Sequence, residues 1–286
     1  MRERFAPSPT GFLHLGHAFS ALTAWRAAQS GEGQFLLRIE DIDTTRSRPE
    51  FEAAIYQDLA WLGLSWPMPV LRQSERLSTY TLTLNTLISN GLCYPCSCSR
   101  RDIADALSAP QEGVDGASGP DGPIYPGTCR HRAMAQRSGH DSIRLNMVRA
   151  IEFLGGASNL KHLKWQETGG YTAPRQSLDA TNLIETCGDV VLARRAIGTS
   201  YHLAVVVDDA AQGITHVTRG HDMQSATQIH RLLQALLGLP TPVYRHHRLI
   251  RDEAGKRLAK RDDARAIRRY RFEGATPQDI FKMVGL

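Results

Sequence analysis

The sequence predicts an α/β fold, in which helices cover a mainly parallel sheet, with one insertion. Three predicted strands, at 2–6, 34–39 and 203–207, of which the last two have apolar cores, alternate with segments whose apolar residues recur at helical spacing. From about 92 to 190 this alternation breaks down, which indicates a segment inserted between two halves of the sheet. The predicted divisions are a first half at 1–91, an inserted subdomain at 92–190, a second half at 191–244 and a basic C-terminal segment at 245–286.

Three helices are predicted in the first half, and each ends at a glycine, which is a common helix stop. Their apolar positions are Ala18, Ala21, Leu22, Trp25 and Ala28 before Gly31; Phe51, Ile55, Leu59 and Leu62 before Gly63; and Leu77, Leu84, Leu87 and Ile88 before Gly91. Inside the insertion, the stretch from Ser108 to Pro123 is rich in Ser, Ala, Gly and Pro and has few apolar residues. We expect that stretch to be a mobile loop.

Composition limits the class of protein. A chain of 286 residues that is 42% hydrophobic can bury a substantial core. No apolar signal region opens the chain, and no run approaches the roughly 18 to 20 apolar residues of a membrane span. We therefore expect a cytoplasmic protein with no membrane partner. In that reducing compartment the five cysteines favour metal or thiol roles over disulfides.

The positive charge is concentrated near the C-terminus. The whole chain carries a net charge of +5, whereas residues 245–271 hold eleven Lys/Arg against four Asp/Glu, a net charge of +7. The rest of the chain is therefore slightly acidic. Such a basic segment is expected of a surface that meets a phosphate backbone, and the alternative is a charged helix that only improves solubility.

Two short motifs carry the strongest chemical signal. The first is the run from Arg4 to Gly11 followed by His14-Leu15-Gly16-His17. It places two ring N–H donors at the expected N-terminus of a helix, where free backbone N–H groups and the dipole favour phosphate. Gly16 lacks a side chain where a nucleotide would approach the backbone. The second is the basic stretch from Arg257 to Arg261, which alone is typical of a solvated surface.

Together the two motifs resemble the paired nucleotide-binding signatures of class I aminoacyl-tRNA synthetases, in the glutamyl/glutaminyl branch. Residues 4–11 match that branch at eight consecutive positions, and Leu15 replaces the commoner Ile of the HIGH motif. The KMSKS motif is matched less closely, because Arg257 and Ala259 replace a lysine and a serine. The resemblance implies a Rossmann-like catalytic domain in which ATP, with Mg²⁺, is bound by His14, Gly16, His17 and Lys260. The two histidines and the lysine are the expected catalytic residues, since they can stabilise the charge that develops as pyrophosphate leaves.

The expected amino-acid substrate is L-glutamate, which carries two carboxylates and one ammonium. Arg4, in the first predicted strand, matches the arginine that this branch directs at the side-chain carboxylate, and bidentate pairing would give strength and geometry. Glu40, at the end of a stretch resembling the family's RIED sequence, is expected to receive the ammonium, with Ser8 beside it. The resemblance adds two positions that line the pocket in the family, Tyr201 and Arg219.

Two aspartates close in sequence to Tyr201 and Arg219 can each be interpreted in two ways. Asp209 follows the predicted strand at 203–207, and Asp222 follows Arg219 closely in the sequence. Each either binds ribose or magnesium at the substrate site, or caps a local turn.

A cysteine cluster predicts a metal site in the insertion. Three cysteines lie within six residues, at 93, 96 and 98, and a fourth follows at 129; soft thiolates at this spacing fit a tetrahedral zinc site. The spacing resembles the family's C-x-C…Y-x-x-x-C arrangement, which implies a structural Zn²⁺ held by Cys96, Cys98, Tyr125 and Cys129. Tyrosine is an unusual ligand because its phenol must lose a proton. The fourth ligand could instead be Cys93, His131 or a water, and the alternative to zinc is a set of reduced, metal-free cysteines.

Over nearly the whole chain the resemblance is closest to the glutamyl-Q tRNA(Asp) synthetase family, the short paralogues of glutamyl-tRNA synthetase. It implies activation of glutamate with ATP, independent of tRNA, and transfer to queuosine at the wobble position of tRNA(Asp), whose anticodon arm is the expected RNA partner. Only 25 residues follow Arg261, so no anticodon-binding domain is expected. Two alternatives remain: a truncated glutamyl-tRNA synthetase that charges a tRNA 3′ end, and a non-catalytic, zinc-containing RNA-binding protein.

Overall fold

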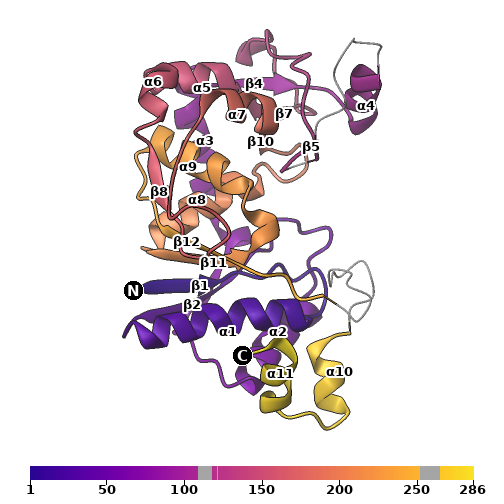
Figure 1. Ribbon diagram of the computed structural model, residues 1–286. Helices are drawn as coiled ribbons and strands as arrows, with labels where there is room; N and C mark the ends of the chain where they lie inside the picture. Colours follow the sequence, from indigo (N-terminus) through magenta and orange to yellow (C-terminus); the bar gives the residue numbers. More distant parts are fainter. Residues whose placement is uncertain (109–117, 121, 252–264) are drawn as a thin grey trace.

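The computed structural model of this protein describes residues 1–108, 118–120, 122–251 and 265–286 (Figure 1). Its centre is parallel β-structure built from two sets of strands, β1-β2-β3 and β11-β12. The two sets meet where β11 runs beside β1, with the Thr215 amide N donating to the Arg2 carbonyl O at 3.0 Å. The strands are β1 Arg2–Phe5, β2 Gln34–Ile39, β3 Leu71–Arg72, β11 His216–Gly220 and β12 Val243–His247.

One helix follows each of the first three strands; the three helices were predicted, but the short strand β3 was not. These are α1 Leu15–Ser30, α2 Pro49–Trp61 and α3 Leu77–Ser89, the last preceded by the 3₁₀ turn η1 Gln73–Arg76. Gly63 and Gly91, just beyond α2 and α3, have φ of +83° and +71°, a backbone conformation that favours glycine. The three predicted helices and their glycine stops are thereby confirmed. None of the helices in the described ranges is both long enough and apolar enough to cross a membrane.

Two apolar cores lie on opposite sides of the central strands (Figure 1). One core joins α1 and α2 to two C-terminal helices, α10 Ile267–Phe272 and α11 Pro277–Val284, through Ile267, Ile280 and Val284. The other joins α3 to the two helices of the second half, α8 Tyr201–Ala211 and α9 Ala226–Leu237, and continues into the insertion. The C-terminal segment therefore folds back against the first half of the protein, beside α2.

The strand predicted at 203–207 is wrong, because these residues lie in the middle of α8. Ser200 caps this helix by accepting from the Leu203 amide N. All five residues of the run are buried, so the run has no polar side, and a continuous apolar run cannot distinguish a buried helix from a buried strand. The first of the parallel strands β11 and β12 begins nine residues after this run, at His216.

The insertion is built on an antiparallel sheet of order β10-β7-β4, in which β4 is Cys93–Cys96, β7 is Ser142–Leu145 and β10 is Val191–Ala193. This sheet includes β10, so it extends past residue 190, where the insertion was predicted to end. The remaining elements of the insertion are α4 Arg100–Ser108, β5 Ser118–Gly119, β6 Gly122–Pro123, η2 Met134–Gln136, α5 Met147–Phe153, α6 Gly156–Leu160, β8 Lys164–Gln166, β9 Arg175–Ser177, α7 Ala180–Asn182 and η3 Leu183–Cys187.

Part of the loop predicted at 108–123 is ordered as two short strands, β5 and β6, which pair antiparallel. Residues 109–117 and 121 of that prediction lie outside the described residues.

Candidate functional site

The first motif forms the N-terminus of α1, as predicted, and its two histidines cap the helix. His14 is the N-cap residue, and its Nδ1 accepts from the Gly16 amide N at 3.1 Å. His17 Nδ1 accepts in turn from the His14 amide N at 3.1 Å, and the two ring centroids are 3.8 Å apart. A side-chain carbon at Gly16 would lie 3.0 Å from His14 Cε1, so any larger residue there would press on the His14 ring.

These hydrogen bonds assign the proton positions of both rings. A neutral imidazole that accepts at Nδ1 carries its proton on Nε2. In neutral rings this places the proton of both histidines on Nε2, beside the N-terminus of α1, where backbone N–H groups also favour an anion. The arrangement can bind phosphate oxygens with neutral donors.

The second motif, with Arg257, Ala259 and Lys260, lies outside the described residues. The chain that follows it returns to the first motif. Ala266 forms an antiparallel bridge with His14, and the Ile267 amide N donates to the Leu13 carbonyl O at 2.8 Å.

A buried network of four charged side chains joins the two halves of the central strands. Asp209, on α8, accepts from Arg4 Nε at 3.1 Å and from Arg38 Nη1 at 2.7 Å. Arg38 Nη2 also donates to Glu40 Oε1 at 3.0 Å. Burial alone would raise the pKa of Asp209, but the two guanidinium groups outweigh it and hold that pKa below its usual value. Asp209 is thus the ionised counterion that Arg4 and Arg38 share.

This role of Asp209 was missed, since the sequence suggested ribose or magnesium binding, or a turn cap. A usable signal was present, because two arginines in predicted buried strands need a buried acid. Burial raises the pKa of the second acid, Glu40, even though Arg38 and Arg4 oppose the shift. Asp222 lies in the short turn η4, His221–Met223, directly after β11.

Arg219, on β11, is a buried cation whose hydrogen-bond partners are all neutral. Its guanidinium donates to His246 Nε2 at 3.1 Å, to His230 Nδ1 at 3.1 Å and to Thr227 Oγ1 at 2.6 Å. Burial lowers the pKa of both histidines, which keeps them neutral acceptors. Within the described part of the chain, no carboxylate forms an ion pair with Arg219. An anionic ligand would supply the charge that this environment lacks.

The residues predicted to bind the amino acid converge around Tyr201, the first residue of α8. Burial raises the pKa of the Tyr201 phenol, and the charges that act on it belong to Arg219, Glu40, Arg4 and Asp209. The Ser8 segment is also near, because the Glu40 amide N donates to the Pro7 carbonyl O at 3.0 Å; Ser8 itself is partly buried.

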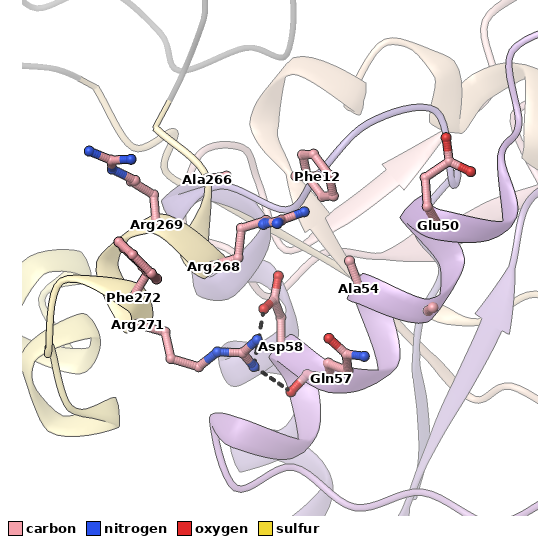
Figure 2. Close-up of a pocket in the computed structure, with 11 residues that line it drawn as sticks. Phe12, Glu50, Ala54, Gln57, Asp58, Ala266, Arg268, Arg269, Arg271 and Phe272 are labelled. Carbon is pink, nitrogen blue, oxygen red and sulfur yellow. Dashed lines mark hydrogen bonds and ion pairs between the residues drawn. The ribbon is translucent and has the colours of Figure 1, made fainter.

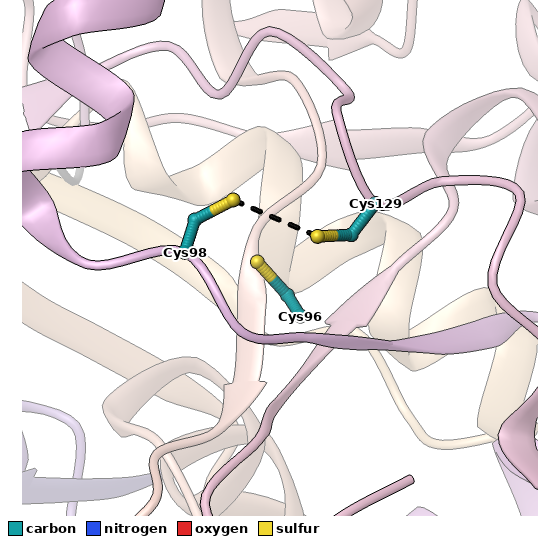
Figure 3. Close-up of side chains that lie close together, drawn as sticks. All are labelled: Cys96, Cys98 and Cys129. Carbon is teal, nitrogen blue, oxygen red and sulfur yellow. Dashed lines mark hydrogen bonds between the residues drawn. The ribbon is translucent and has the colours of Figure 1, made fainter. Parts of the chain in front are cut away.

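The predicted metal ligands also converge (Figure 3). The sulfur atoms of Cys96, Cys98 and Cys129 all lie within 4.8 Å of one another, and Cys98 and Cys129 are 3.6 Å apart. Ligands 2.3 Å from a tetrahedral zinc stand about 3.8 Å apart, so this spacing fits zinc. Tyr125 Oη lies 3.4 Å from the sulfurs of both Cys96 and Cys98. Among the described residues, Cys93 is not part of this group: it faces the apolar core, where burial raises its pKa to about 12.

Without a metal, the groups of the cluster differ in how readily they ionise. Burial raises the pKa of the Cys98 thiol to about 11 and keeps the Tyr125 phenol neutral. At Cys129 burial acts in the same direction, but hydrogen bonds from Tyr125 and Ser97 outweigh it and lower the pKa to about 6. One thiolate is therefore available at neutral pH.

Comparison with known proteins gives consistent matches. The family model described as tRNA synthetases class I (E and Q), catalytic domain, matches residues 1–286. A Rhodobacter capsulatus protein named glutamyl-Q tRNA(Asp) synthetase is 54% identical over 289 residues, covering 100% of both chains. A Nitratidesulfovibrio vulgaris protein of the same name is 37% identical, covering 98% of this chain and 84% of its own.

Solved structures agree at the level of the fold. A glutamate tRNA ligase from Elizabethkingia meningosepticum, in complex with its amino acid, superposes with a TM-score of 0.73 at 26% identity. A glutamate-tRNA synthetase from Elizabethkingia anophelis superposes with a TM-score of 0.75 at 26% identity. The matches cover 100% of this chain but only 60% and 61% of those two proteins.

Proposed function

This chain belongs to the class I tRNA synthetases of the glutamate and glutamine type, a family of ATP-dependent ligases, and on that premise we propose that it activates L-glutamate and transfers it to queuosine at the wobble position of tRNA(Asp). The names of its full-length relatives support this acceptor over a tRNA 3′ end. The anticodon arm of tRNA(Asp) is then the part of the RNA that binds at the site around Tyr201.

The observation that carries the proposal is the set of charges around Tyr201. Arg219 offers a buried cation with no carboxylate partner in the described structure, which suits one carboxylate of glutamate. Arg4 is held in place by Asp209, yet its Nη1 makes no hydrogen bond to a described residue, which leaves a donor for the side-chain carboxylate. Glu40, with Ser8 beside it, supplies acceptors for the ammonium.

The activation step needs positioning and charge stabilisation rather than a base. The substrate carboxylate, already an anion, attacks the α-phosphorus of ATP; the glutamyl-adenylate bond forms and pyrophosphate leaves. His14 and His17 donate from Nε2 to phosphate oxygens, and Lys260 neutralises the departing pyrophosphate. Mg²⁺ bound with ATP would neutralise further phosphate charge. A hydroxyl of queuosine then attacks the acyl carbon, an ester forms and AMP leaves.

The cysteine cluster is proposed to hold one structural zinc ion through Cys96, Cys98, Cys129 and Tyr125. Three sulfurs and one phenol oxygen at these spacings fit a closed, four-coordinate site with no position for substrate. Such a closed site would stabilise the insertion and take no part in the chemistry. Free thiols also fit the cytoplasm, which is where we place the reaction.

The deciding experiment identifies the nucleotide that receives labelled glutamate. The protein is incubated with labelled glutamate and ATP together with either queuosine-containing tRNA(Asp) or tRNA(Glu), and the RNA is then digested to nucleosides. We expect label on queuosine and none on tRNA(Glu). Label on the 3′ end of tRNA(Glu) would support the truncated-synthetase alternative, and no glutamate-dependent ATP–pyrophosphate exchange would support the non-catalytic one.

A further inference from the structure

A pocket lies between α2 and α10, and none of the residues proposed to bind glutamate lines it (Figure 2). Its volume is about 860 Å³, which is ample for a nucleotide. The side chains that matter for its chemistry are Phe12, Asp58, Arg268, Arg269, Arg271 and Phe272. Three arginines and two phenylalanines in one pocket combine cationic groups with flat apolar surfaces.

Arg268 is positioned to bind an anion. Its guanidinium lies over the Phe12 ring, 4.3 Å from the centroid, a geometry that fixes its plane. No hydrogen bond or ion pair joins Arg268 to any residue in the described ranges, so its N–H donors are available. Arg269 pairs with Glu273, whereas Arg271 approaches Asp58 with its Nη1 3.7 Å from Oδ1.

Asp58 lies at the floor of this pocket, on α2, and Figure 2 shows its carboxylate directed at Arg271 and Arg268. The side chain is fully buried, and neither carboxylate oxygen has a hydrogen-bond partner among the described residues. Burial raises its pKa to about 6, although both arginines act in the opposite direction. This acid therefore offsets the repulsion between the two cations without occupying their N–H donors.

Phe272 completes the pocket with an exposed aromatic ring. It is 84% exposed, more than any other large apolar side chain in the described part of the chain. It follows Arg268 and Arg269 on the same short helix. A ring so exposed beside several guanidinium groups, one of them with available N–H donors, is typical of surfaces on which nucleobases stack.

We propose that the pocket between α2 and α10 binds an unstacked nucleotide of a single-stranded RNA loop. The base stacks on Phe272, and the flanking phosphates contact Arg268 and Arg269. This proposal rests on the proposed function for the identity of the partner as tRNA. The charge of +7 over residues 245–271 favours a polyanion, and flat aromatic and guanidinium surfaces favour RNA over an acidic peptide.

The position of the pocket connects it with the chemistry. Phe12 lies two residues before His14, and Ala266, at the edge of the pocket, forms a backbone bridge with His14. An RNA loop seated here would therefore contact the same short segments that hold the first motif. The pocket would anchor the RNA beside the first motif while the acceptor base reaches the site around Tyr201.

The test measures binding of an unmodified tRNA(Asp) transcript, which lacks the queuosine acceptor, at several salt concentrations. Phe272→Ala should weaken binding about tenfold with little change in salt dependence, because the change removes base stacking but leaves the phosphate contacts in place. Arg268→Gln should weaken binding and reduce the slope of log affinity against log salt by about 0.7 to 0.9. Two exposed positions away from the pocket serve as matched controls, Phe153→Ala and Arg101→Gln.

Each outcome decides the proposal. Wild-type affinity in both pocket variants overturns it and leaves the pocket for an acidic protein segment. An equal loss of RNA affinity in the control variants overturns it too. So does a Phe272→Ala protein that has lost glutamate-dependent ATP–pyrophosphate exchange in the absence of RNA, because that loss would indicate a general defect. The failure of the proposed function would look different: the pocket variants would still differ in RNA affinity, but queuosine would gain no label.

Discussion

At the scale of single residues, the site depends on how buried charges are paired. Arg4 and Arg38 share Asp209, and Arg38 also pairs with Glu40, so two cations meet two acids inside the protein. The sequence motifs located Arg4 and Glu40 but not Asp209, because its partners lie more than 170 residues away in the chain. Proximity of that kind is a property of the fold and leaves no local pattern.

Replacing Arg4 with Ala should chiefly weaken glutamate binding. The change removes the donor proposed for the side-chain carboxylate, and a buried charge that loses its partner costs about 2–5 kcal/mol. We expect the KM for glutamate to rise far more than kcat falls, measured by ATP–pyrophosphate exchange. Arg2→Ala, at the exposed start of the same strand, is the matched control. An unchanged KM in Arg4→Ala would refute the assignment of this residue.

At the scale of elements, the helices of the first half were predictable and the second half was not. Each of those helices shows apolar spacing and a glycine stop, which are local signals. The run at 203–207 has no polar face, so its spacing could not show a helix, and the local signals of one, the cap at Ser200 and the glycine at 213, lie outside the run. The cysteine cluster was predictable in part, since the family spacing named ligands from β4 and a distant loop that the fold brings together.

The contact between α2 and α10 should make stability depend on pH through Asp58. Its folded-state pKa of about 6 exceeds the usual 3.8, so between about pH 4 and 6 the folded protein holds a proton that the unfolded chain has released. Stability from this group therefore falls as pH rises through that window. Asp58→Asn should be more stable than wild type at pH 7, by roughly 1–2 kcal/mol, and should lose that advantage near pH 4.

Urea unfolding of the wild type and of Asp58→Asn at pH 7 and near pH 4 measures the effect. Asp43→Asn provides a control in which the change of stability with pH has the opposite sign. Hydrogen bonds from Thr45 and Arg46 lower the pKa of Asp43, so its stabilising contribution is present at neutral pH and is lost as pH falls through the folded-state pKa. An Asp58→Asn protein whose stability relative to wild type did not change with pH would show that the buried carboxylate does not titrate in this window.

Replacing Cys98 with Ser should lower the metal content and loosen the insertion. A zinc site with three thiolates loses affinity when one becomes a hydroxyl, because the metal prefers soft ligands. Metal analysis of protein purified without chelator or added zinc should give about one zinc per wild-type chain and much less in the variant. Cys93→Ser, five residues away and outside the described cluster, should keep its zinc. A wild-type protein that is folded, active and free of metal would rule out this role.

At the scale of the whole molecule, the proposed amino-acid site is assembled from both halves of the chain. Arg4 and Glu40 come from the first half, whereas Tyr201 and Arg219 come from α8 and β11 of the second. The insertion separates these halves in the sequence, yet its apolar core is continuous with the second half. Closing the main fold therefore brings the site together, and the relative positions of its charges are set by the same contacts that stabilise the protein.

This assembly leads to the expectation that activation does not require RNA. The side chains proposed to bind glutamate are already held by partners within the chain: Arg4 by Asp209, and Arg219 by His230, His246 and Thr227. A site whose charges are fixed before any RNA binds pays no ordering cost when RNA is absent.

We therefore expect RNase-treated protein to catalyse glutamate-dependent ATP–pyrophosphate exchange at a rate that added tRNA changes little. Glutamine is the matched control substrate, because it lacks the second carboxylate that Arg4 is proposed to bind, and it should support little exchange. Exchange that appeared only after tRNA(Glu) was added would mean that the charges around Tyr201 are not in their working positions without RNA, and it would favour the truncated glutamyl-tRNA synthetase alternative.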